Sequence, residues 1–115
     1  MILNKDKKAV LFIFSTLILL SCKKEDKGSP GPNEIWLEYK AYNPSQLVVT
    51  AGTTVTFTNK DNANHTVTST NNTFDSGTVK SGNNYSYTFN NKGTFYFYCN
   101  YHSGNSAEQG AILVQ

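Results

Sequence analysis

Apolar and polar residues alternate with a period of two over most of the chain from residue 35 onward. This period is typical of β-strands with one buried face, and the segments are rich in threonine, valine and aromatic residues, which favour strands. The predicted strands are 35–41, 46–50, 53–58, 65–69, 84–89, 94–99 and 110–115. Turn signals separate them, and no helical stripe of useful length occurs. Seven or eight short strands predict an all-β, single-domain β-sandwich with Greek-key connections.

Two of these strands carry alternating aromatic residues. Tyr85, Tyr87 and Phe89 alternate on one strand, and Phe95 and Phe97 alternate on another. Aromatic stripes with this period usually belong to a sandwich core and its flanking surface. We therefore interpret them as packing residues and not as an electron relay.

The N-terminus has the pattern of a secretory signal. Lysines precede an apolar stretch over residues 9–20, which is too short to span a bilayer. It ends in Leu-Leu-Ser-Cys, which resembles the lipobox of bacterial lipoproteins. The resemblance implies a signal peptide over residues 1–21 and a lipid on Cys22, which would anchor the protein to a bacterial membrane, periplasmic or at the cell surface on the outer membrane. The alternative is an ordinary signal peptide with an incidental cysteine.

Residues 22–34 follow as a predicted flexible tether, because after the cysteine they contain no large apolar side chain. A Lys-Lys-Glu-Asp run directly after Cys22 resembles the export signal of surface-exposed lipoproteins, although a solvated linker explains it equally well. The folded domain is predicted to span residues 35–115.

The charge distribution limits the possible partners. The formal net charge of +2 lies entirely within residues 1–21, and the remainder has seven lysines and seven acidic residues. Nucleic-acid binding would require a basic face, so it is not expected. The neutral domain also gives no basis for electrostatic steering of a partner.

The chemistry-bearing residues are few and fall in two segments. The chain has two histidines, His65 and His102, and Cys99 is its one cysteine outside the signal region. One thiolate and two imidazoles form the ligand set of a mononuclear blue-copper site. Singly, each residue has a simpler explanation, such as a buried apolar cysteine. A structural zinc site would need more thiolate ligands, and a Cys–His nucleophile has no evident third member.

The ordered motifs resemble the cupredoxins, in the small plastocyanin- and amicyanin-like group. The resemblance covers residues 35–114 and is carried by segments 55–67, 74–77, 82–89 and 92–99 together with His102. It implies an eight-stranded Greek-key sandwich with copper, cycling between Cu(I) and Cu(II), near one end. His65, Cys99 and His102 match the family's metal ligands, and Thr66 is placed to donate a hydrogen bond near the sulfur.

The axial ligand departs from the family pattern. Cupredoxins usually have methionine there, but the only methionine is Met1. Counting back from Gly110, which resembles the glycine that opens the final strand, gives Glu108, and Gln109 is adjacent. We favour Glu108, then Gln109, as a possible axial ligand, with the absence of any side-chain axial ligand as the alternative.

These features predict a membrane-tethered one-electron carrier that is monomeric and exchanges electrons with redox partner proteins. Copper storage or delivery is the alternative, and a metal-free interaction module is a third. No enzymatic activity is expected, because a single domain lacks the second copper centre and substrate cleft of multicopper oxidases.

Overall fold

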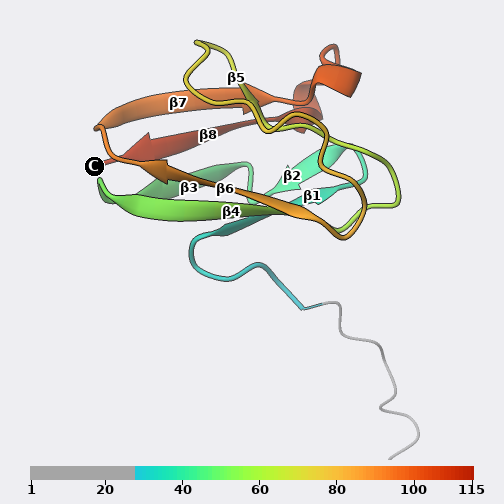
Figure 1. Cartoon of the computed structure of the whole chain (residues 1–115), viewed down its shortest axis with the longest axis horizontal. Coiled ribbons are helices and arrows are strands. Elements are labelled where there is room, and N and C mark those ends of the chain that lie inside the picture. Colours follow the sequence, from blue (N-terminus) through green and yellow to red (C-terminus); the bar gives the residue numbers. More distant parts are fainter. Residues whose placement is uncertain (1–27) are drawn as a thin grey trace, which may run out of the picture.

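The computed structural model describes residues 28–115, which form two facing β-sheets (Figure 1). The strands are β1 (Glu34–Glu38), β2 (Ala41–Asn43), β3 (Gln46–Val49), β4 (Thr53–Asn59), β5 (Thr68–Ser69), β6 (Asn84–Phe89), β7 (Gly93–Tyr98) and β8 (Gln109–Val114). Two short 3₁₀ helices, η1 (Asn100–His102) and η2 (Ser106–Glu108), connect β7 to β8. The all-β sandwich predicted from the sequence is confirmed.

Each sheet has four strands, in the orders β2-β1-β4-β6 and β3-β8-β7-β5. The pairs β1–β4 and β3–β8 are parallel, whereas the other pairs are antiparallel. The connection through η1 and η2 lies at the end of the sandwich opposite the C-terminus (Figure 1). Strand β7 therefore delivers its last residues, and β8 its first, to the same end.

The alternating pattern separates core from surface as the sequence predicts. On β4, Val55 and Phe57 are fully buried between threonines, and on β7 Phe97 is buried whereas Tyr96 is 58% exposed. The rings of Phe57 and Phe97 meet edge to face across the two sheets, with centroids 5.5 Å apart. Such pairs add to the free energy gained by burying apolar area. The interpretation of the aromatic stripes as packing residues is confirmed.

Two predicted strands differ from the structure. Segment 35–41 is not one strand, because the chain turns at Tyr39 and Lys40 and β2 pairs back onto β1. Lys40 has a φ of 56°, so a left-handed turn forms there without the usual glycine or asparagine. Segment 65–69 is extended only at Thr68 and Ser69, and His65 lies outside the strand in an isolated bridge to Val79.

Gly110, next to the first residue of β8, is required by close packing. A Cβ atom at this position would lie 2.5 Å from Phe97 Cζ and 2.7 Å from the Ser45 carbonyl oxygen. Replacing Gly110 by alanine should therefore destabilise the domain by about 1–3 kcal/mol through overpacking. Urea unfolding of the metal-free protein measures this loss. Gly104→Ala is the matched control, because no atom lies within 4 Å of the added carbon, and equal stability of the two variants would contradict the packing argument.

The N-terminal predictions concern residues outside the described part of the chain. The signal peptide, the lipidated Cys22 and the first part of the tether, up to residue 27, lie in residues 1–27, so they stay predictions. Residues 31–34 form a turn in which the Gly31 N–H donates to Glu34 Oε1 at 2.9 Å. No helix within residues 28–115 has the length and apolar character needed to cross a membrane.

Candidate metal centre

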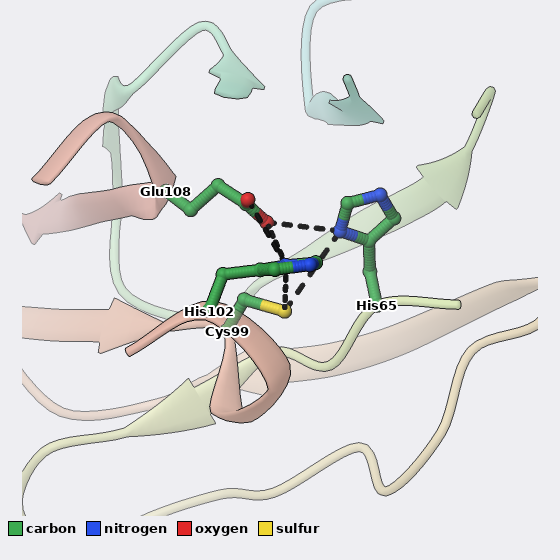
Figure 2. Close-up of side chains that lie close together, drawn as sticks. All are labelled: His65, Cys99, His102 and Glu108. Carbon is green, nitrogen blue, oxygen red and sulfur yellow. Dashed lines mark hydrogen bonds and ion pairs between the residues drawn. The ribbon is translucent and has the colours of Figure 1, made fainter. Parts of the chain in front are cut away.

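Four side chains converge at the end of the sandwich that carries η1 and η2 (Figure 2). His65 follows the loop after β4, Cys99 follows β7, and His102 and Glu108 end η1 and η2. Each residue offers one donor atom, and the four donor atoms all lie within 4.8 Å of one another. The structure thus brings together the three predicted ligands and Glu108.

The distances between donor atoms fit a single metal ion. Cys99 Sγ lies 3.8 Å from His65 Nδ1 and 3.6 Å from His102 Nδ1. Glu108 Oε1 lies 3.0 Å from His65 Nδ1 and 3.1 Å from His102 Nδ1. Donors bound at about 2.0–2.3 Å, the bond lengths found in zinc sites, stand about 3–4 Å apart around a shared ion. The spacing therefore leaves room for one ion among the four atoms.

Three of the four side chains are buried, and the fourth is partly exposed to solvent. Cys99, Glu108 and His65 are each at most 1% exposed, whereas the His102 side chain is 38% exposed. Among the described residues, the Glu108 carboxylate contacts the two histidine rings and the Asn105 amide, and no lysine forms an ion pair with it. A buried carboxylate beside a thiol is costly without a compensating cation. A bound metal ion would supply that charge.

The second nitrogen of His65 determines the role of the first. His65 Nε2 lies 2.8 Å from Asp61 Oδ2, and the hydrogen bond from this imidazole is the main reason that the pKa of Asp61 is held below its usual value. An ionised Asp61 only accepts, so Nε2 carries the proton. In the neutral ring, Nδ1 then presents a lone pair to Glu108 and Cys99. A nitrogen lone pair that faces a carboxylate oxygen lacks a hydrogen between the two atoms, and a metal ion bound by both would fill that place.

Backbone hydrogen bonds hold the loop that carries three of the donors. The Cys99 N–H donates to the Glu108 carbonyl at 3.3 Å, and the His102 N–H donates to the Cys99 carbonyl at 3.1 Å. Asn105 accepts the Ala107 N–H with its side chain, which caps η2. The turns of η1 and η2 therefore place residues nine positions apart in the chain side by side.

Thr66 supports the site differently from the sequence expectation. Its hydroxyl accepts the Asn100 N–H at 2.8 Å and pairs with the Thr68 hydroxyl at 2.9 Å, so it steadies the residue after Cys99. Its carbonyl accepts the Tyr42 hydroxyl at 2.7 Å. Burial raises the pKa of Tyr42 well above its ordinary value, and the nearby Cys99 and Glu108 add to the effect. Tyr42 is therefore a neutral donor beside the site.

Of the two predicted axial candidates, only Glu108 lies in the cluster. Gln109 is exposed at the start of β8 and lines a surface hollow of about 330 Å³ together with Thr70 and Tyr96. No role was assigned to Asp61 from the sequence alone. Its position four residues before His65 was a signal that its carboxylate could contact the histidine. Tyr101 is 53% exposed and its hydroxyl pairs with Thr78 at 2.6 Å.

The fold and this donor set define a cupredoxin. The sequence profile of the cupredoxin-like domain matches residues 9–114, and the chain belongs to that family. Copper is therefore the cofactor that this site fits, and a thiolate with two imidazoles is the donor set suited to it. No curated protein matches the sequence.

Solved structures of cupredoxins share the fold. A purple cupredoxin from Nitrosopumilus maritimus is 26% identical, with a TM-score of 0.65 over 71% of this chain and 98% of that one. An oxidised methionine-to-leucine mutant of amicyanin is 23% identical, with a TM-score of 0.67 over 77% of this chain and 87% of that one. Oxidised plastocyanin from the fern Dryopteris crassirhizoma is 17% identical, with a TM-score of 0.61 over 71% of this chain and 99% of that one. These similarities place the described strands in the cupredoxin arrangement.

Proposed function

We propose that this protein is a one-electron carrier with a mononuclear, type 1-like copper site. The ligands are His65 Nδ1, Cys99 Sγ, His102 Nδ1 and a carboxylate oxygen of Glu108. The observation that carries the proposal is the convergence of these four donors in one cluster within 4.8 Å. Membership of the cupredoxin family supports the same conclusion.

When bound, copper supplies the Cu(I)/Cu(II) couple, and the chain supplies a fixed environment for it. The thiolate suits the reduced ion, whereas imidazoles and a carboxylate suit the oxidised ion. The backbone bonds through η1 and η2 and the bridge at His65 hold the donors in place. A site that barely rearranges between the two oxidation states exchanges electrons quickly. The half-exposed ring of His102 is the point at which a redox partner protein makes contact.

The geometry favours a carrier over copper delivery. Release of Cu(I) to another protein requires accessible, soft ligands, but three of the four donors are buried and one is a hard carboxylate. It also favours a carrier over an enzyme, because catalytic metal sites keep an open coordination position and four protein donors fill this one. We infer that the protein works as a monomer.

The carrier is proposed to be tethered to a bacterial membrane through lipidated Cys22, facing the periplasm or the cell surface. The support is the lipobox-like segment 19–22 and the polar residues that follow it. Because residues 31–34 form a turn that leads into β1, only residues 23–30 are left as a tether, and fully extended they would reach at most roughly 30 Å from the membrane. This reach would let the domain approach a membrane-bound partner. Metabolic labelling with a fatty-acid analogue tests this anchor.

The experiment that tests the function is titration of the metal-free protein with Cu(II), followed by visible and EPR spectra and voltammetry. We expect one copper per chain, an intense thiolate-to-copper band and reversible one-electron reduction. A colourless complex, or tight Cu(I) binding without reversible oxidation, would instead indicate storage or delivery.

A further inference from the structure

We propose that Asp61 is a positioning residue of the copper site, which orients His65 and adds negative charge behind its ring. This inference rests on the proposed copper-binding function. The direct observation is the 2.8 Å contact between Asp61 Oδ2 and His65 Nε2. His65 is 1% exposed and the Asp61 side chain 14%, so the contact is largely shielded from water.

Hydrogen bonds within the loop before His65 hold this carboxylate in place. The Asp61 N–H donates to Asn59 Oδ1 at 2.8 Å, and Asn59 is 1% exposed. The Asn59 amide in turn donates to the carbonyls of Ala63 and Val79, at 2.8 Å each. Asp61 Oδ1 accepts the Asn62 N–H at 2.8 Å, which leaves Oδ2 for the histidine. Each carboxylate oxygen of Asp61 therefore has its own hydrogen-bonding partner. The buried Asn59 side chain holds the backbone of the loop in place through its bonds to Asp61, Ala63 and Val79.

The two histidines differ in this respect. His65 has a carboxylate on its outer nitrogen, whereas within residues 28–115 the outer nitrogen of His102 has no hydrogen-bonding partner from the protein. A carboxylate partner fixes the tautomer of a ligand histidine and makes its other nitrogen a stronger donor. His65 is therefore the rigid, electron-rich ligand, and His102 is the ligand left free to meet solvent or a partner.

The charge of Asp61 also acts on the choice of oxidation state. With copper bound, the Cys99 thiolate and the Glu108 carboxylate would place two negative charges at the donor atoms. Asp61 would add a third negative charge on the far side of the His65 ring. A negative charge favours the more positive ion, so Asp61 stabilises Cu(II) relative to Cu(I). Its removal should weaken Cu(II) binding more than Cu(I) binding.

Two substitutions separate orientation from charge. Asp61→Asn keeps an oxygen that can accept the His65 Nε2–H but removes the charge, whereas Asp61→Ala removes both. Glu38→Gln is the control, because it makes the same change of net charge on β1, where Glu38 accepts a bond from Asn43. Two sets of measurements test the proposal. ¹⁵N NMR of the metal-free protein at mildly alkaline pH reports the tautomer of the His65 ring, and the copper-loaded protein gives the copper affinity and the reduction potential.

In the metal-free wild type and in Asp61→Asn we expect the Nε2–H tautomer of His65. In Asp61→Ala we expect a shift towards the Nδ1–H tautomer, because the Glu108 carboxylate, 3.0 Å from Nδ1, is then the remaining acceptor beside the ring. Cu(II) affinity should fall about 10–100-fold in Asp61→Ala. In Asp61→Asn the reduction potential should rise. The rise should be about 59 mV for each factor of ten by which the loss of Cu(II) affinity exceeds the loss of Cu(I) affinity. The Glu38→Gln control should match the wild type in every measurement.

An unchanged tautomer and unchanged affinity in Asp61→Ala would overturn the proposal. Because the NMR measurement needs no metal, it separates this inference from the function itself. If no variant bound copper but the tautomer still shifted in Asp61→Ala, the carrier function would fail and the positioning role of Asp61 would stand.

Discussion

Replacing Cys99 by serine is expected to abolish the intense visible band of the copper-loaded protein and to lower its copper affinity by more than about 100-fold. The band requires a thiolate bound to copper, and a serine hydroxyl stays protonated and is a poor ligand for either oxidation state. Loss of an outer hydrogen bond alone costs 10–100-fold in affinity, so loss of a ligand should exceed this range. Visible spectroscopy and a competitive copper titration measure both effects.

Cys22→Ser is the matched control for Cys99→Ser, since Cys22 is the only other cysteine in the chain. The Cys22 variant should keep the band while losing any lipid. A second variant, Cys99→Ala, guards against a folding artefact, because Cys99 is fully buried and a hydroxyl there costs free energy of its own. If the band survived in both Cys99 variants, the sulfur would not bind copper.

Replacing Glu108 by glutamine is expected to raise the reduction potential by on the order of 100–200 mV, since it removes one negative charge next to the ion. Two unit charges about 4 Å apart interact by roughly 4 kcal/mol at an effective dielectric constant near 20. Oxidation adds one unit charge to copper, and about 59 mV corresponds to each tenfold change in the equilibrium of a one-electron couple. Voltammetry measures the shift, and EPR reports whether the site remains intact.

Gln109→Ala controls for the neighbouring candidate. Because Gln109 is exposed and lies outside the cluster, its loss should leave both potential and spectrum unchanged. A shift with Gln109→Ala and none with Glu108→Gln would make Gln109 the fourth ligand. In the metal-free protein, Glu108→Gln removes a buried charge without a lysine partner, so its free energy of unfolding should not fall.

Local sequence patterns were sufficient for most of the fold. The alternation of Val55 and Phe57 with threonines, and of Phe97 with Tyr96, predicted which side chains would be buried. The patterns were insufficient where the chain turned without glycine, asparagine or proline, as at Lys40, and where a short extended run did not pair along its length, as at His65. A turn and a strand pairing depend on what lies across the sheet, which a period of two does not encode.

The candidate site divides in the same way. The sequence by itself determined the donor types, because the chain holds only two histidines and one cysteine beyond the signal region, in segments with cupredoxin order. Only the tertiary structure decided that Glu108 lies inside and Gln109 outside, and that Asp61 supports His65. The physical reason is distance along the chain: His65 and Glu108 are 43 residues apart, and packing of the two sheets brings them to 3.0 Å.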